Sequence, residues 1–445
     1  MMTITLLILV IAAIILITAF WKIHPLPVLL LGGFLFGVCN HYGFLETLEL
    51  LASGFGNTMK SIGLVIIAGT VIGVFMEQRG ALKVIAEKII FLTGEKHTPL
   101  AMSIIGYIVS ICIFCDSAFI ILIGLWKKIG KMAKLPLAVG ATALSMGLFA
   151  SHCFIPPTPG PLAAMSILGA EFGRVLLFGS LAALGATFAG YFYSLHAGKN
   201  EILEEQELLE AGRDPEKEIS FPYHWSIAFL PILIPLVLIG ANSFAGIYKE
   251  NLSSSFIKFL ACAGHPVTAL TIGAFLAIFL MGKWKKRELS AEGLMGKAVL
   301  EGANILVITA SGGAFGEVLK KVDFASFLPE GIGNMGVFAL LVPLVFASVM
   351  KIAQGSSTLA ILTAASVTAP MLDTLNLSSP EMRALACCAV CCGGMMVSHT
   401  NDSFFWVVTR FSGMSVRQGL KLQTAGTLVS GLAATIVLLL LAFIV

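Results

Sequence analysis

Apolar runs recur along the whole chain, separated by short polar segments. They include residues 3–20, 25–39, 175–193, 225–241 and 428–445. A helix crosses the ~30 Å hydrocarbon layer of a bilayer with about 20 apolar residues, so runs of this length indicate membrane spans. The composition agrees, since 57% of the residues are apolar and 12% are charged, against about 25% charged in soluble proteins. The pattern predicts an all-α membrane protein that uses the lipid bilayer as its solvent.

The charge, the first residues and the cysteine content argue against a nucleic-acid-binding protein, a cleaved signal peptide and a metal site. The net charge is +3 and no basic patch is interleaved with aromatic residues, so we expect no nucleic-acid partner. The first twenty residues lack a positive region and a small-residue cleavage site, which predicts a retained helix. Four of the nine cysteines fall within residues 387–392. Cysteine on a helix favours close packing, whereas a metal site needs preorganised geometry. We therefore expect packing, with no metal and no cofactor.

Two clusters of basic residues predict the orientation, because positive loops stay in the cytoplasm. The clusters are Lys127, Lys128, Lys131 and Lys134, and Lys283, Lys285, Lys286 and Arg287. With both inside, residues 1–196 and 224–445 each make five full crossings, the amino terminus is periplasmic, and the acidic segment 197–223 is a cytoplasmic linker. Because five is odd, the second half enters the membrane upside down relative to the first.

The two halves show the same order of parts, which predicts two inverted-topology repeats. Each has scaffold helices (1–92; 224–330), a re-entrant hairpin (98–128; 335–373), a broken transmembrane helix (135–170; 382–410) and a closing helix (174–196; 420–445). Ser151-His152 and Ser398-His399 occupy equivalent breaks. Inverted repeats with broken helices are typical of secondary transporters, which bind substrate near the midplane.

The polar residues at membrane depth are the candidate site. Seventeen residues separate Pro99 from Asp116, about 25 Å of helix, so Asp116 and Ser117 lie near the tip of the first hairpin. An ionised Asp facing lipid there would cost about 2.5–3.5 kcal/mol or more, so we expect Asp116 to face a cavity. A second interpretation, as the N-cap of the second arm, is compatible with the first.

The second hairpin carries Lys351 at the equivalent depth. It is followed by Gln354, Gly355, Ser356, Ser357 and Thr358. Gly355 allows a tight reversal, and the N-terminus that follows favours a carboxylate. Lys351 is too deep to reach the surface easily and therefore needs a partner. The partner is either the carboxylate of the substrate or, in a fixed internal salt bridge, Asp116 or Asp402.

Two helix breaks complete the site. The first runs through His152 and Thr158 into a proline-rich segment that cannot be continuous helix. The second holds six consecutive polar residues, 398–403, inside an apolar stretch. The predicted substrate ligands here are Thr158, Asn401 and Ser403. The predicted proton carriers are Asp116, His152, His399 and Asp402, because histidine titrates near neutrality and a carboxyl group in a low dielectric holds its proton more tightly.

Four motifs resemble the gluconate permease family of the ion transporter superfamily, in matching order and over the whole chain. They are 114–119 (FCDSAF), 155–161 (IPPTPGP), 351–358 (KIAQGSST) and 398–403 (SHTNDS), the last followed by Phe405-Trp406. The resemblance implies a proton symporter of the bacterial inner membrane for sugar acids such as gluconate, with a D-serine branch. It also implies a dimerising scaffold domain and a mobile domain that holds both hairpins and moves like an elevator.

This chain departs from the family pattern at the proposed site. Thr158 replaces the usual His, Lys351 the usual Arg, Cys115 the usual Phe, and Phe404 the usual Gly. An ammonium cannot make the bidentate fork of a guanidinium with a carboxylate. A shorter acid such as glycerate or threonate is therefore an alternative substrate.

The predicted function is proton-coupled import of a small hydroxylated carboxylate. One alternative keeps the fold and couples to sodium through Ser117, Asn401 and Ser403, and another is a passive channel. An intramembrane enzyme using Ser398, His399 and Asp402 is disfavoured, because adjacent side chains on a helix point apart. The expected partners are the carboxylate, protons or sodium, the lipid bilayer and a second copy of the chain.

Overall fold

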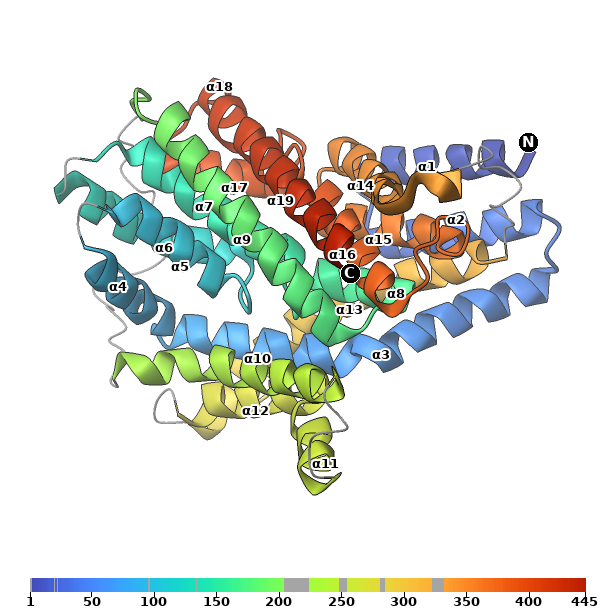
Figure 1. Cartoon of the computed structure of the whole chain (residues 1–445), viewed down its shortest axis with the longest axis horizontal. Coiled ribbons are helices and arrows are strands. Elements are labelled where there is room, and N and C mark those ends of the chain that lie inside the picture. Colours follow the sequence, from blue (N-terminus) through green and yellow to red (C-terminus); the bar gives the residue numbers. More distant parts are fainter. Residues whose placement is uncertain are drawn as a thin grey trace.

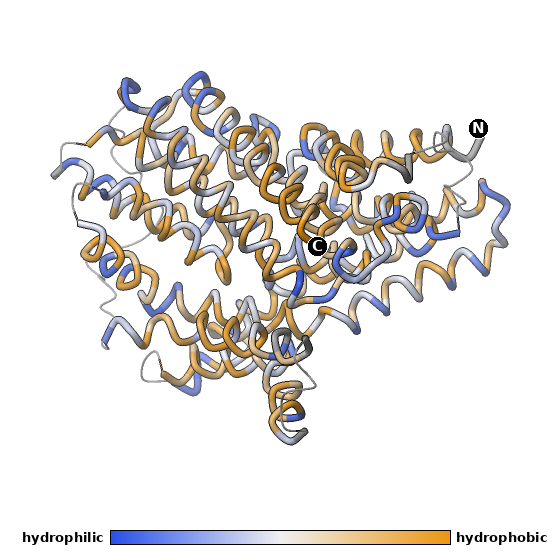
Figure 2. Tube along the Cα trace, viewed as in Figure 1, coloured by the Kyte–Doolittle hydropathy of each residue, from blue (hydrophilic) through white to orange (hydrophobic). Residues whose placement is uncertain are grey.

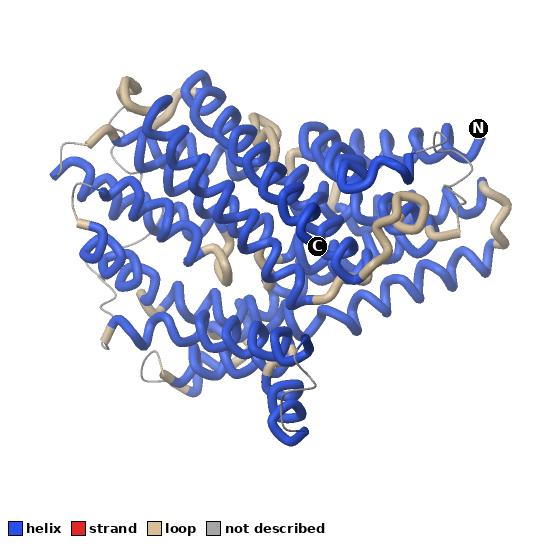
Figure 3. The backbone as a smooth tube through the Cα atoms, viewed as in Figure 1, coloured by secondary structure: helices blue, strands red, loops and turns tan. Residues whose placement is uncertain are grey.

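The computed structural model describes residues 2–19, 21, 23–94, 97–132, 135–203, 224–247, 254–280, 285–321 and 332–445. Every regular element in these ranges is a helix (Figure 3). Among the described residues, seven helices are long and apolar enough to cross a membrane, or eight if the pair 255–263 and 266–279, bent by 62°, counts as one span. The all-α, multi-pass class is therefore confirmed, and the apolar colouring follows the helices while polar residues gather at their ends (Figure 2).

The first half contains nine helices among its described residues. They are α1 (Met2–Ala19), α2 (Pro25–Cys39), α3 (Phe44–Gln78), α4 (Ala81–Thr93), α5 (Thr98–Val109), α6 (Cys115–Met132), α7 (Leu137–Phe154), α8 (Pro159–Leu168) and α9 (Phe172–Ala197).

The second half follows in the same manner. Its α-helices are α10 (Trp225–Ile247), α11 (Ser254–Ala263), α12 (Pro266–Phe279), α13 (Leu294–Leu319), α14 (Leu341–Gln354), α15 (Ser357–Thr368), α16 (Pro380–Met395), α17 (Ser403–Ser412), α18 (Val416–Gly419) and α19 (Ala425–Ile444). Shorter turns are η3 (Lys286–Leu289), η5 (Ile332–Leu340), η6 (Ala369–Met371) and the π-helical η7 (Leu420–Thr424).

The chain is interrupted at the four places that the sequence predicts. Residues 110–114 separate α5 from α6, 155–158 separate α7 from α8, 355–356 separate α14 from α15, and 396–402 separate α16 from α17. Prolines end α7, because they remove N–H donors and clash with the preceding turn. Gly355 reverses the chain with φ +78°, and an added Cβ would collide with the backbone of Asn401.

Several helices differ from the expected spans. α3 is 35 residues long, well beyond the about 20 residues that cross a bilayer. Within the predicted scaffold segment 224–330, α11 and α12 are two helices bent by 62°, because Pro266 starts a new helix after the bend. Ten crossings were expected, whereas seven or eight helices pass by length and apolar composition; α2 has only 15 residues, and a polar break divides α16 from α17. Residues 204–223 of the predicted linker and 322–331 of the scaffold lie outside the described residues.

Two groups of helices meet at the centre of the molecule. In one, α13 packs along α3 and also contacts α2, while α12 packs on α3 and α10. In the other, α7 packs between α5 and α9, and α16 packs against α14 and α19. Helices α8 and α15 lie against each other and both contact α13, so the ends of the broken helices face the first group (Figure 1).

Candidate functional site

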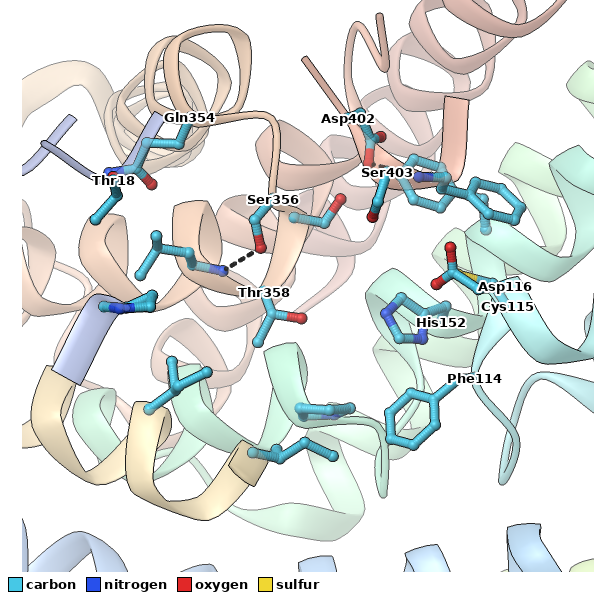
Figure 4. A pocket seen from close by; sticks show the side chains of 18 of the residues that line it. Thr18, Phe114, Cys115, Asp116, His152, Gln354, Ser356, Thr358, Asp402 and Ser403 are labelled. Carbon is cyan, nitrogen blue, oxygen red and sulfur yellow. Dashed lines mark hydrogen bonds between the residues drawn. The ribbon is translucent and has the colours of Figure 1, made fainter. Parts of the chain in front are cut away.

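A cavity of about 550 Å³ opens where the helix breaks meet (Figure 4). Eight of the predicted site residues line it: Asp116, His152, Gln354, Ser356, Ser357, Thr358, Asp402 and Ser403. They come from the start of α6, the end of α7, the α14–α15 break and the start of α17. Segments separated by almost three hundred residues thus contribute to one chamber, as expected for a binding site at broken helices.

The N-terminus of α15 points its free donors at this cavity. Ser356 is the N-cap, and its Oγ accepts a hydrogen bond from the N–H of Leu359 at 3.3 Å. The N–H groups of Ser357 and Thr358 occupy the first two helical positions, which have no intrahelical acceptor. Both residues line the cavity. The positive end of the helix dipole and two unsatisfied N–H groups make the start of α15 a favourable binding position for a carboxylate group. We call this position, at Ser357 and Thr358, the carboxylate seat.

Gln354 lies beside that seat. Its side chain is 7% exposed, and neither its Nε2 nor its Oε1 has a hydrogen-bond partner in the described structure. Buried amides are normally satisfied, so both atoms of this amide are available to hydrogen-bond a polar group that enters the cavity.

The N-terminus of α8 is a poor anion site by comparison. Pro159 and Pro161 provide no N–H group. The hydroxyl of Thr158 donates to the carbonyl of Ile155 at 2.5 Å and lines a separate, smaller cavity of about 20 Å³. Gly160 is the one residue among the first three of α8 that carries an N–H group, so the N-terminus of α15 offers more donors than that of α8.

Asp116 lies on the opposite side of the cavity, in the first turn of α6, with Cys115 and His152 beside it (Figure 4). The carboxylate accepts from the Cys115 thiol at 3.7 Å and forms no ion pair among the described residues. The Nδ1 atom of His152 is buried and also lacks a hydrogen-bond partner in this part of the chain. Two titratable groups, one without an ion pair and one with an unsatisfied ring nitrogen, therefore face the chamber.

Lys351 takes the salt-bridge arrangement that the sequence left open. Its ammonium lies 2.6 Å from Oδ2 of Asp402, donates to the carbonyl of Gly355, and stands 5.3 Å from the centre of the Phe149 ring. The side chain is 0% exposed and is not part of the cavity lining. In this conformation Lys351 does not line the chamber itself, but it forms an ion pair with Asp402, which does.

His399 and Asn401 also face away from the cavity. His399 Nε2 and Asn401 Nδ2 both donate to the carbonyl of Ile352, at 3.0 Å and 2.8 Å. Because a carbonyl only accepts, the proton of the His399 ring is on Nε2. Ser117 and Gly355 are likewise absent from the lining.

The cavity contains residues that the sequence analysis missed. Phe114, Phe149 and Phe404 supply aromatic surface, and Thr18 and His24 come from the corner between α1 and α2. His24 is the N-cap of α2, with its Nδ1 accepting from the N–H of Leu26 at 3.3 Å. His24 lies near a span boundary in the sequence, and no local pattern predicts that this corner lines the same cavity as the distant α14–α15 break.

The cysteines of α16 are buried and pack within the helix bundle. Cys387, Cys388, Cys391 and Cys392 are all at most 1% exposed. The Cys387 thiol donates to the carbonyl of Pro161 at 3.7 Å. They lie on the helix that joins α8, α14 and α19, where small side chains allow close contact.

Comparisons with known proteins identify related membrane permeases. Residues 1–444 match the model of the GntP family permease. The chain is 28% identical to a gluconate permease of Pseudomonas aeruginosa (98% of this chain, 96% of the relative) and 30% identical to the D-serine transporter DsdX of Escherichia coli (99% and 98%).

An uncharacterized permease of Haemophilus influenzae is 31% identical over 88% of this chain and 82% of its own. A crystal structure of the YdaH transporter of Alcanivorax borkumensis shares the fold, with a TM-score of 0.60 and 16% identity over 89% of this chain and 88% of that one. These relatives are permeases and transporters, not enzymes. The chain belongs to the GntP family of permeases.

Proposed function

We propose that the protein is a proton-coupled symporter that imports a small hydroxylated carboxylate across the bacterial inner membrane. The observation that carries this proposal is the chamber itself. A helix N-terminus with free N–H groups at Ser357 and Thr358 faces one side of it, and an unpaired carboxylate, Asp116, faces the other. The first attracts an anion and the second a cation, which is what a symporter must bind together.

The carboxylate group of the substrate binds at the start of α15. Gln354 and Ser356 border the same position. The amide of Gln354 and the hydroxyl of Ser356 can therefore hydrogen-bond to hydroxyl groups of the substrate that lie near its carboxylate. Ser403 supplies a further hydroxyl from α17.

Asp116 and His152 carry the coupled proton. Of the four predicted carriers, these two line the chamber without a cationic or carbonyl partner, whereas Asp402 and His399 are held by other groups. Sodium coupling is the second candidate, since the hydroxyl of Ser403 lines the chamber together with the carboxyl groups of Asp116 and Asp402.

Two inverted repeats that operate as an elevator explain the arrangement of parts. Both α5–α9 and α14–α19 contain two interrupted pairs of helices followed by a long helix, and the chamber lies where these helices meet Ile305 and Ile308 of α13. In this scheme residues 1–92 and 224–330 form the scaffold of a homodimer, and the amino terminus is periplasmic. Substrate then crosses the membrane within the group that carries both hairpins.

A ligand screen by thermal shift tests the binding part of this proposal, because a ligand stabilises the state that it binds. Purified protein is heated with three- to six-carbon hydroxy acids and with both enantiomers of serine. At a concentration of 100 times Kd, a bound ligand stabilises by about 2.7 kcal/mol, which is an easily measured shift. Stabilisation by one or more hydroxy acids supports the proposal, serine alone favours the D-serine alternative, and no shift with any of them contradicts both.

Uptake at fixed pH with sodium replaced by choline separates the two coupling ions. Unchanged uptake excludes sodium, and loss of uptake after addition of an uncoupler supports the proton.

A further inference from the structure

We propose that Lys351 and Asp402 are positioning residues that clamp the two helix breaks of the second half together, and that neither binds the substrate. The inference rests on the proposed function, because it concerns how the carboxylate seat of α15 is held. It assigns the buried charges of this region a role other than direct contact with the substrate or the coupled proton.

The ammonium of Lys351 has no donor left for a ligand. An ammonium carries three N–H groups. One meets Asp402 Oδ2 at 2.6 Å, one meets the carbonyl of Gly355, and the third side faces the ring of Phe149 at 5.3 Å, a favourable cation–π position. To bind a substrate carboxylate, Lys351 would first have to break one of these bonds inside a fully buried site.

Asp402 is similarly occupied. Its Oδ2 also accepts from the hydroxyl of Ser398 at 2.5 Å, and its Oδ1 accepts from the N–H of Phe404 at 3.1 Å as the N-cap of α17. As the N-cap, the Asp402 carboxylate is itself the anionic group at the N-terminus of α17. The ammonium and carboxylate together carry no net charge, so the attraction for an anion comes from the free N–H groups of α15.

Further bonds join the same two breaks. The carbonyl of Ile352, near the C-terminus of α14, is bound by His399 and Asn401, which satisfies an end group that α14 cannot satisfy itself. The backbone of Ser398 is in turn tied to α19 and η7, with its N–H on Thr427 Oγ1 at 3.0 Å and its carbonyl on Thr424 Oγ1 at 2.6 Å. The end of α14, which leads into α15, is thus held through the α16–α17 break to α19 and η7.

A double-mutant cycle tests the clamp. The variants are Lys351→Gln, Asp402→Asn and the double variant, and the readouts are Kd for a carboxylate that stabilises the wild type and the melting temperature without ligand. Removing one partner leaves the other charge buried and unpaired, so each single variant should lose about tenfold or more in affinity and should melt earlier. The double variant should recover affinity to within about threefold of wild type and should still accumulate substrate against its gradient.

The alternatives give different results. If Lys351 binds the substrate, the double variant will bind as weakly as Lys351→Gln, which overturns the proposal. If Asp402 carries the coupled proton, the double variant will bind but will not accumulate substrate, which overturns it as well. Lys351→Arg keeps the charge, so its affinity and its melting temperature should both lie closer to those of the wild type than the values of Lys351→Gln. Arg79→Gln, which breaks the 2.7 Å pair with Glu288 outside the chamber, is the control and should leave Kd unchanged.

If no carboxylate stabilises the wild type, the proposed function fails, and the clamp is decided by melting alone. The double variant must then melt above both single variants, and a melting temperature at or below either of them contradicts the clamp.

Discussion

The ring of Phe404 stacks on that of Phe149, with centroids 5.1 Å apart and planes 18° apart. Phe119 meets Phe404 edge-on at 6.1 Å. Three rings from α6, α7 and α17 therefore close one wall of the chamber, and Phe404 and Phe149 line it. This wall offers no hydrogen bond to a hydroxyl group, so it limits how far a polyhydroxylated chain can extend from the carboxylate seat.

Replacing Phe404 with Ala should shift the preference toward longer acids. Room for one more carbon in a binding pocket is worth about 1–3 kcal/mol, so the ratio of affinities for a six-carbon over a three-carbon acid should rise by about tenfold or more. Competition for uptake of a labelled short acid measures the ratio. Phe404→Leu keeps most of the volume and should lie in between; a ratio that is the same in all three proteins would show that this wall does not select length.

Asp116→Asn should abolish proton-driven accumulation, because the amide cannot take up and release the proton. Exchange of labelled for unlabelled substrate across the membrane should persist, since the seat at α15 is intact. Uptake by this variant should no longer respond to a pH gradient. Asp373→Asn, at a carboxylate that bonds Ser378 on the surface, is the matched control and should accumulate normally. Gradient-driven accumulation by Asp116→Asn would remove Asp116 from the coupling step.

Gln354→Ala should weaken substrate binding without destabilising the free protein. Loss of one neutral hydrogen bond costs about 0.5–1.5 kcal/mol, a factor of roughly 2–13 in Kd. In the absence of substrate the amide is unpartnered, so its removal should leave the melting temperature unchanged or higher. The contrasting control is Gln423→Ala, which leaves Ser145 without its 2.6 Å acceptor and should lower the melting temperature. A lower melting temperature with unchanged Kd for Gln354→Ala would show that its role is structural.

Ser61 on α3 and Ser166 on α8 should lock transport when both are replaced by cysteine. Their hydroxyls lie 2.6 Å apart, across the contact between the proposed scaffold and the proposed moving group. If α8 travels past α3, a disulfide at this point must stop the cycle, and reduction must restore it. Each single cysteine variant controls for the nine native cysteines. Full transport with the disulfide demonstrably formed would argue against an elevator motion at this boundary.

The breaks in the helices could be predicted because their causes are local. The prolines around Thr158, the positive φ of Gly355 and the polar run beginning at Ser398 each interrupt a helix wherever they are placed. Counting residues predicted similar membrane depths for Asp116 and for the segment 351–358, and the structure shows that both segments contribute to one cavity.

The direction of the side chains could not be predicted in the same way. His399 and Asn401 lie in the predicted break, yet they turn toward the end of α14, because its free carbonyl at Ile352 needs donors. His24 joins the chamber only because the α1–α2 corner packs beside α14. The direction in which these side chains point depends on which distant groups lack hydrogen-bond partners after folding. No local sequence pattern predicts it.

The central claim is that this chamber binds a carboxylate and a proton and moves them together. Its most direct test is uptake of a labelled hydroxy acid, identified by the thermal-shift screen, into proteoliposomes with an imposed inside-alkaline pH gradient and no sodium. We predict accumulation above the outside concentration, which collapses when an uncoupler is added. Uptake that only equilibrates with the outside, or accumulation that is indifferent to the uncoupler, would contradict proton-coupled symport.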